Sequence, residues 1–247
     1  MIKGVFFDLY GTLLIYRDMR AAWAAWRAEL LRLLHAREPE FTRREMLECS
    51  RNLFSSAPPP ACGRLTVYER KIRRMAREAG IALSHPAARR IASRTIAVWQ
   101  KHIPPDPAAG KVIRELAKRG KKIALITNFD HPPHVHALLA RMRIAPFFGA
   151  VIISGDAGFK KPDPRIFRIA LARLNLRASE TVFVGDSADD VRGARAAGIT
   201  PVLVIRSRRA PFLVPLWARR ARRVIVVRRL TELLELAGVP PGHCAVR

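Results

Sequence analysis

Short apolar runs alternate with helical patterns through the second half of this chain, from about residue 104 onward. The runs are rich in Val and Ile, and the segments between them place apolar residues three and four apart, as helices do. Buried strands that alternate with helices form a parallel sheet with helices on both faces. We therefore predict an α/β fold with a Rossmann-like, doubly wound parallel sheet. The expected strands are 5–9, 122–128, 150–154, 181–186, 201–205 and 224–227, and the expected helices are 108–119, about 133–142, 163–175, 189–197 and 230–237.

The first half of the chain carries a different pattern. Residues from about 15 to about 101 show only helical periodicity, interrupted by the Pro-rich stretch 56–63. Trp23 and Trp26 lie three apart and should share one face of a helix. A second Pro-rich break at 104–107 ends this region. The predicted division is an α/β core domain made of 1–14 and 102–247, with an all-helical domain inserted at 15–101.

The composition narrows the class of protein. Hydrophobic residues make up 49% of the chain, enough for a packed core. Cys49, Cys62 and Cys244 show neither CxxC nor zinc spacing, which favours a reducing compartment. No apolar run reaches the length of about 18 residues that a membrane helix needs. We expect a cytoplasmic protein with no membrane partner.

The formal net charge is +25, and the arginines are spread along the chain. No known nucleic-acid-binding motif accompanies them, so we expect no specific nucleic-acid partner. A positive field would still attract a small anionic substrate. We interpret the densest group as a solvated face. It consists of Arg206, Arg208, Arg209, Arg219, Arg220, Arg222 and Arg223.

Three histidines follow the strand predicted at 122–128, in the segment HPPHVH. Their spacing resembles that of metal ligands, but the prolines indicate the start of a helix. We interpret His131, His134 and His136 as surface imidazoles at that helix entry.

Four chemically useful side chains lie at the end of a predicted strand or just beyond one. They are Asp8, Thr127, Lys161 and Asp186. Because ligands bind at the carboxyl ends of strands in such sheets, these side chains can converge. A carboxylate can act as a nucleophile, and several carboxylates can hold Mg²⁺. A hydroxyl and an ammonium group can hold phosphate oxygens.

Four sequence segments resemble the motifs of the haloacid dehalogenase (HAD) superfamily, in the right order. FFDLYGTLL resembles the first motif, LITN the second, GFKKPDPRIF the third and VFVGDSADDVRGARAAG the fourth. The resemblance implies a hydrolase whose Asp attacks the substrate. It assigns Asp8 as the nucleophile, Thr127 as the phosphate-binding hydroxyl with Asn128 beside it, Lys161 as the motif lysine, and Asp186 and Asp190 as the acidic pair.

The resemblance also implies a magnesium site and a cap. Asp8, Asp186 and the backbone carbonyl of Tyr10 would be the protein ligands, with Asp190 in support. Two adjacent carboxylates are hard to explain without a cation. The helical stretch 15–101 resembles a cap that closes over the active site and excludes water.

Tyr10 departs from the pattern of the family's phosphatases. At this position they usually carry a second Asp, which acts as general acid and general base. DxYGT instead resembles the L-2-haloacid dehalogenases, because a halide leaves without protonation. The metal-free dehalogenases of that kind, however, resemble one another in a segment SSN at the positions where this chain has Gly185, Asp186 and Ser187. They also have a Tyr at the position where this chain has Phe167. They also use an arginine early in the cap, for which the candidates are Arg17, Arg20 and Arg37.

The first hypothesis is therefore a Mg²⁺-dependent phosphatase that acts through an aspartyl-phosphate on a small phosphorylated metabolite. Its substrate would contact Tyr10, Thr127, Asn128 and Lys161. One alternative is a haloacid dehalogenase, favoured by Tyr10. Another is a weakly catalytic binding protein that uses its positive surface. A monomer and a homodimer are both compatible with the sequence.

Overall fold

The computed structural model of this chain describes residues 1–55, 64–206 and 224–236. The described residues form two compact units, which we call the α/β unit and the helical unit. The α/β unit comprises Met1–Ile15, Pro105–Phe129 and the described residues from His136 onward, and the helical unit comprises Tyr16–Pro104 and Asp130–Val135.

The α/β unit is built on a parallel sheet with the strand order β3-β2-β1-β4-β5-β6. Each neighbouring pair is parallel, as expected for short, nearly continuous apolar strands that are covered on both faces. The order of the strands reverses between β1 and β4, which is where ligands bind in open α/β sheets. The bounds are β1 Gly4–Phe7, β2 Lys122–Thr127, β3 Ala150–Ile153, β4 Thr181–Gly185, β5 Thr200–Val204 and β6 Ile225–Val227.

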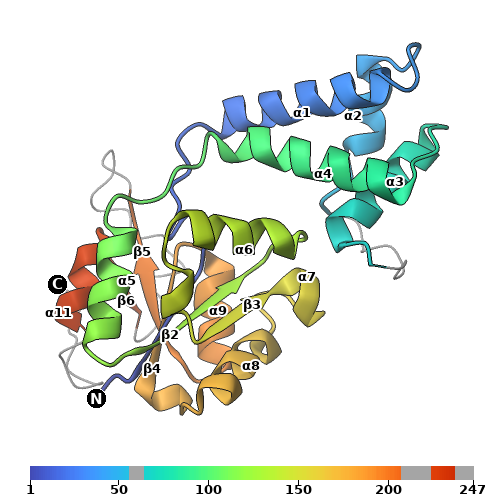
Figure 1. The fold of residues 1–247 in the computed structure, drawn as a ribbon. Helices are drawn as coiled ribbons and strands as arrows, with labels where there is room; N and C mark the ends of the chain where they lie inside the picture. The colour runs from blue at the N-terminus through green and yellow to red at the C-terminus, as the bar shows by residue number, and fades with distance from the viewer. Residues whose placement is uncertain (56–63, 207–223, 237–247) are drawn as a thin grey trace. The chain divides into compact units, whose positions relative to one another are not determined.

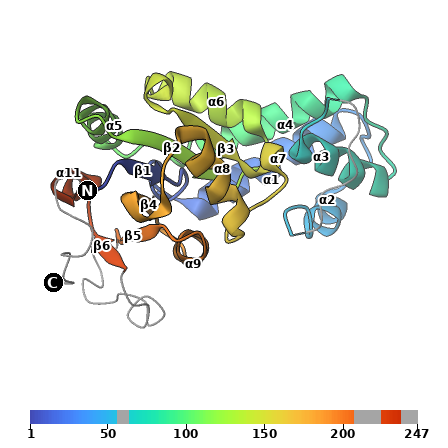
Figure 2. The same cartoon turned by 90° about the horizontal axis from the view of Figure 1, so that it is seen from below.

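Helices cover both faces of this sheet. Figure 2 shows α5 (Ala109–Lys118) and α11 (Leu233–Leu236) on one face, and α8 (Pro164–Leu174) and α9 (Ala188–Ala196) on the other. The core between α8, α9 and the sheet contains fully buried side chains from both layers, including Phe6. The remaining elements with residues in this unit are α6 Pro132–Arg141, α7 Ser154–Ala157 and the short 3₁₀ turns Ala145–Phe147, Ala178–Glu180 and Leu230–Glu232.

The helical unit contains α1 (Met19–His35), α2 (Arg43–Ser50), α3 (Val67–Glu78) and α4 (His85–Gln100), which are labelled in Figure 1. Helix α4 packs against both α1 and α3. Each of these helices starts at a side chain that accepts a hydrogen bond from the backbone of its first turn, as N-caps do. The rings of Trp23 and Trp26 lie 5.9 Å apart on α1, so the predicted shared face is confirmed.

The predicted α/β class is confirmed, and two local expectations are wrong. The helix expected at 230–237 is a 3₁₀ turn followed by the short α11. His131 is buried, not exposed: its Nε2 lies 3.4 Å from Glu69 Oε1, and its ring meets Tyr68 edge-on. This long-range packing places Asp130–Val135 in the helical unit. In the described part of the chain, no helix has the length and apolar character needed to cross a membrane.

Candidate active site

Three carboxylates meet at the carboxyl edge of the sheet, where the strand order reverses. Asp8 follows β1, and Asp186 follows β4, in a register that pairs Phe7 with Val184. Asp190 belongs to the first turn of α9. One oxygen atom from each of Asp8, Asp186 and Asp190 lies within 4.8 Å of the others. Among the described residues, this is the one cluster with the composition and spacing of a metal site.

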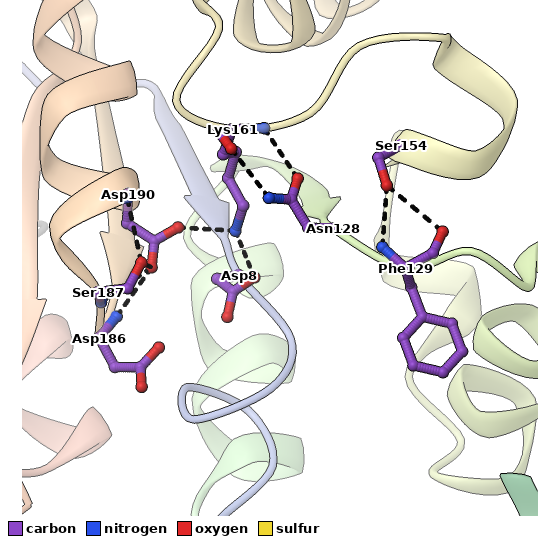
Figure 3. Close-up of polar contacts among 8 residues, drawn as sticks. All are labelled: Asp8, Asn128, Phe129, Ser154, Lys161, Asp186, Ser187 and Asp190. Atoms are coloured by element: carbon purple, nitrogen blue, oxygen red, sulfur yellow. Dashed lines mark hydrogen bonds and ion pairs between the residues drawn. The ribbon is translucent and has the colours of Figure 1, made fainter. Parts of the chain in front are cut away.

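Lys161 pairs with two of these carboxylates (Figure 3). Its Nζ lies 2.5 Å from Asp8 Oδ1 and 2.7 Å from Asp190 Oδ1, and its side chain is only 4% exposed. Asn128 holds the backbone of this lysine through two hydrogen bonds. The Asn128 Nδ2 donates to the Lys161 carbonyl at 3.0 Å, and the Lys161 N–H donates to Asn128 Oδ1 at 2.8 Å. The sequence motifs predict Asn128 only as a contact to the substrate and do not predict these bonds to Lys161.

Asp190 also organises the loop between β4 and α9 (Figure 3). Its Oδ2 accepts hydrogen bonds from the N–H groups of Asp186 and Ser187, at 3.2 and 3.0 Å, and from the Ser187 hydroxyl at 2.7 Å. With Oδ2 satisfied in this way, Oδ1 faces Lys161. Asp190 therefore joins the backbone beside Asp186 to the ammonium group that pairs with Asp8.

The cluster concentrates negative charge in a buried place. Burial raises the pKa of Asp8 to about 7; Lys161 opposes the shift, and Asp190 adds to it. Burial also raises the pKa of Asp186 to about 6, and Asp190 again adds to the shift. Burial lowers the pKa of Lys161, but Asp8 and Asp190 outweigh that effect and raise it. One ammonium group does not balance three carboxylates, so the donor set fits a hard divalent cation such as Mg²⁺.

Two glycines permit the close approach of these side chains. Gly11 has a φ of +91°, and a Cβ atom there would lie 2.0 Å from Asp186 Oδ2. A Cβ atom on Gly185 would lie 2.5 Å from the carboxyl carbon of Asp190. Any other residue at position 11 would also adopt an unfavourable backbone conformation. The glycine that follows Tyr10 is therefore required by the position of Asp186.

Thr127 and Tyr10 lie at the same edge of the sheet. Thr127 is the buried last residue of β2, whose register pairs Leu125 with Phe7. Tyr10 is buried, and its ring stacks on Phe129 with centroids 5.1 Å apart. The Phe129 N–H donates to Ser154 Oγ at 3.0 Å, and this bond holds the backbone of Phe129 (Figure 3). The sequence does not predict a role for Phe129, because Tyr10 lies more than a hundred residues away from it in the chain.

Arg206 corrects the interpretation of the arginine group as a solvated face. Its side chain is 23% exposed and donates to the backbone carbonyls of Gly11 and Thr12. The other six arginines of that group lie outside the described residues.

Residues 2–198 match the family described as haloacid dehalogenase-like hydrolase. This chain is a haloacid dehalogenase-like hydrolase. The match covers all four motif segments, together with the helical region between the first and the second. The order of strands, the acidic cluster and the paired lysine thus belong to a hydrolase, and the predicted family is confirmed.

Named relatives of this HAD-like hydrolase include phosphatases. Phosphoserine phosphatase from Thermus thermophilus is 37% identical over 142 residues, which are 57% of this chain and 55% of that protein. The match therefore spans about half the length of that relative. Glyceraldehyde 3-phosphate phosphatase from Methanopyrus kandleri is 28% identical over 217 residues, which cover 84% of this chain and 86% of that protein. Both of these relatives are phosphatases by name.

A solved structure of a dehalogenase also resembles this HAD-like hydrolase. The 2-haloacid dehalogenase from Pseudomonas syringae has a TM-score of 0.69 and 25% identity, with 96% of this chain and 98% of that chain covered. In the present structure, Phe167 occupies the position of the tyrosine expected in such an enzyme. It is fully buried and packs edge-on against Phe183 at 4.9 Å. Position 167 is therefore part of the core and provides no hydroxyl group.

Proposed function

We propose that this HAD-like hydrolase is a Mg²⁺-dependent phosphatase that acts on a small phosphorylated metabolite. The observation that carries the proposal is the buried cluster of three carboxylates, in which Lys161 pairs with Asp8. Asp8, Asp186, Asp190 and the backbone carbonyl of Tyr10 are the groups that would hold the cation. When bound, Mg²⁺ would neutralise charge on the carboxylates and on the phosphate.

In the proposed reaction, Asp8 is the nucleophile. Lys161 engages Oδ1, which leaves Oδ2 to attack phosphorus. The new bond joins Asp8 to phosphorus, and the bond from phosphorus to the leaving oxygen breaks. Lys161 and the Thr127 hydroxyl hold phosphate oxygens as charge develops. Water then attacks the phosphorus of the aspartyl-phosphate, and the bond from Asp8 to phosphorus breaks. This step releases inorganic phosphate and restores the Asp8 carboxylate.

Position 10 offers no carboxyl group to protonate the leaving oxygen. A phenol with a pKa near 10 is a poor general base at neutral pH. General acid–base help contributes about 10²–10⁴-fold to such reactions. We therefore expect rapid turnover of aryl and acyl phosphates, whose leaving groups need no protonation, and slow turnover of alkyl phosphates. Equal kcat values for phenyl phosphate and an alkyl phosphate would contradict this role of position 10.

The helical unit is proposed to act as the cap of this enzyme. Most of it, Tyr16–Pro104, follows the first motif directly in the chain. A cap would exclude water from the aspartyl-phosphate and supply contacts to the organic part of the substrate.

Dehalogenation is the second candidate, because Tyr10 and the resemblance to the Pseudomonas syringae enzyme favour it. In that reaction, Asp8 would attack carbon and displace halide. The acidic cluster separates the two candidates, since a halide leaving from carbon needs no divalent cation. Asp186 has no role in it.

The deciding experiment measures product release from p-nitrophenyl phosphate and from L-2-chloropropionate, each with Mg²⁺ and with EDTA. Asp8→Asn is the test variant. Asp189→Asn is the matched control, because Asp189 lies beside Asp190 but is exposed and pairs with Arg192. We expect Mg²⁺-dependent phosphate release that disappears in Asp8→Asn and persists in Asp189→Asn. Chloride release that persists in EDTA would contradict the phosphatase proposal and support the dehalogenase.

A further inference from the structure

Arg206 lies just beyond β5 and reaches the loop that follows the nucleophile. We define that segment, residues 9–14, as the nucleophile loop. The Arg206 Nε donates to the Gly11 carbonyl at 3.3 Å, and Nη2 donates to the Thr12 carbonyl at 2.5 Å. Nη1 donates to the carboxylate of Asp106, which is itself buried. One guanidinium group thus joins three segments that are far apart in sequence.

The nucleophile loop is otherwise held by a small number of backbone hydrogen bonds. The Gly11 N–H donates to the Leu14 carbonyl, and the Leu14 N–H donates to the Leu9 carbonyl, both at 2.9 Å. The Asp106 N–H donates to the Leu13 carbonyl, also at 2.9 Å. These bonds close the loop on itself and join it to the start of α5. They do not engage the Gly11 and Thr12 carbonyls, which Arg206 binds.

Gly11 lies between Arg206 and the acidic cluster. Its carbonyl accepts from Arg206, and its Cα is so close to the Asp186 carboxylate that no Cβ would fit. The arginine thereby holds the backbone of the nucleophile loop against Asp186. Since Asp8 immediately precedes this loop, its distance from Asp186 depends on the same backbone.

The contacts of Arg206 are those of a positioning residue and not of a phosphate ligand. All three guanidinium nitrogens donate to acceptors of the protein itself. A planar guanidinium group can direct several donors at fixed angles, whereas the ammonium group of a lysine is a single point donor. Arginine is therefore suited to hold two successive carbonyls and a carboxylate together.

We propose that Arg206 is a positioning residue that keeps the nucleophile loop against Asp186 and so sets the geometry of the Asp8–Asp186 pair. The inference rests on the proposed phosphatase function, but the attachment of the nucleophile loop by Arg206 can be tested without an activity measurement. Arg206 lies two residues beyond β5 and outside the four motif segments.

The test compares Arg206→Gln and Arg206→Lys with the wild-type protein. Arg119→Gln is the matched control, because Arg119 also pairs with a carboxylate, Glu115, and donates to a backbone carbonyl, that of Leu234. Three quantities are measured: kcat and KM for p-nitrophenyl phosphate with saturating Mg²⁺, the melting temperature, and hydrogen exchange at the amides of Gly11 and Leu14.

We expect Arg206→Gln to lower kcat by about 10–100-fold, because small displacements of reacting groups cost about that much. KM should change by less than about 3-fold, since the guanidinium nitrogens of Arg206 donate to groups of the protein and not to the substrate in the proposed arrangement. Exchange at Gly11 and Leu14 should accelerate in metal-free protein. Arg206→Lys should recover part of kcat, and Arg119→Gln should change neither kcat nor exchange at these two amides.

The proposal is overturned if Arg206→Gln keeps kcat within about 2-fold of the control, or if exchange at Gly11 and Leu14 is unchanged. Absence of phosphate release by the wild-type protein would overturn the proposed function. Hydrogen exchange alone would then test whether Arg206 holds the nucleophile loop. Should Arg206→Gln not fold, Asp106→Asn removes the ion pair and keeps the acceptor at Oδ1 for the Ala108 N–H. Asp106→Asn should accelerate hydrogen exchange at the same two amides. Unchanged exchange would again overturn the proposal that Arg206 holds the nucleophile loop.

Discussion

At the scale of single residues, the active site depends on how closely charged groups approach one another. Lys161 balances part of the charge on Asp8 and Asp190, and Gly11 lets Asp186 reach the nucleophile loop. A buried ion pair contributes little to stability on balance, but removing one partner leaves an uncompensated charge. Three carboxylates with one paired ammonium group leave the cluster with an excess of negative charge.

Gly11→Ala tests this close packing. The new Cβ would collide with the Asp186 carboxylate, and the positive φ is unfavourable for alanine. We expect kcat for p-nitrophenyl phosphate to fall by about 100-fold or more. Gly120→Ala is the control, since Gly120 also has a positive φ but nothing lies within 4 Å of its Cβ position. Equal effects of the two substitutions on kcat would show that backbone strain, and not contact with Asp186, explains the loss.

At the scale of elements, α3 holds the start of α6 within the helical unit. The Lys71 ammonium pairs with Asp130 at 2.8 Å, and the Tyr68 N–H donates to the Asp130 carbonyl at 3.0 Å. The Lys71 side chain is buried, whereas that of Asp130 is 33% exposed. Asp130 lies two residues after Asn128, which positions Lys161. The contact therefore attaches the segment that begins at Asp130 to α3, within the helical unit.

A double-mutant cycle tests this attachment. Asp130→Ala should lower the free energy of unfolding by about 2 kcal/mol, because it leaves the Lys71 ammonium buried without its carboxylate. Adding Lys71→Met should restore most of that loss, since the buried charge is removed and the volume is kept. Urea titration measures both variants. If the two losses simply add, the ion pair has no part in the attachment.

The contact between α1 and α4 should depend on pH through Glu29. Hydrogen bonds from Arg32, on α1, and from Arg94, on α4, lower the pKa of Glu29 to about 2 against the opposing effect of burial. A folded-state pKa below the unfolded value of 4.5 means that this stabilisation is present above pH 4.5 and is lost as the pH falls toward 2.

Glu29→Gln should therefore lower the free energy of unfolding by about 1 kcal/mol at pH 7, a value reduced for the solvent exposure of both arginines. The difference between the variant and the wild-type protein should shrink as the pH approaches 3. Urea titrations at pH 7, 5 and 3 measure it. A difference that stays constant over this range would exclude Glu29 as the titrating group.

At the scale of the whole molecule, the net charge of +25 should affect how substrates arrive. A positive field raises the encounter rate of anionic ligands, and salt screens that field over about 10 Å at 0.1 M ionic strength. The acidic cluster is a local exception within this field, because its three carboxylates outnumber the one lysine that pairs with two of them.

The charge of the substrate should therefore control the response to salt. We expect kcat/KM for p-carboxyphenyl phosphate to fall more steeply between about 0.02 and 0.3 M NaCl than that for p-nitrophenyl phosphate, because the first carries one more negative charge. Both are aryl phosphates, so the comparison isolates charge. Identical salt dependence for the two substrates would show that the net charge does not steer them.

The sequence by itself determined the class of fold and the convergence of the charged residues. Apolar strands that alternate with helices form a parallel sheet. The two acids and the lysine, which are Asp8, Asp186 and Lys161, lie at the ends of predicted strands or just beyond them. These are local signals, because periodicity and position along a strand need no knowledge of distant partners. They predicted the α/β core, but not which groups pair with which.

Only the tertiary structure decided the partners. Arg206 looks in the sequence like one arginine among many, and its role follows from carbonyls nearly two hundred residues away. His131 is buried by α3, and Phe129 is stacked on Tyr10, through contacts that no local pattern encodes. Hydrogen bonds and ring contacts between distant segments depend on distances of a few ångströms, which the packing of the folded chain sets and the order of residues does not display.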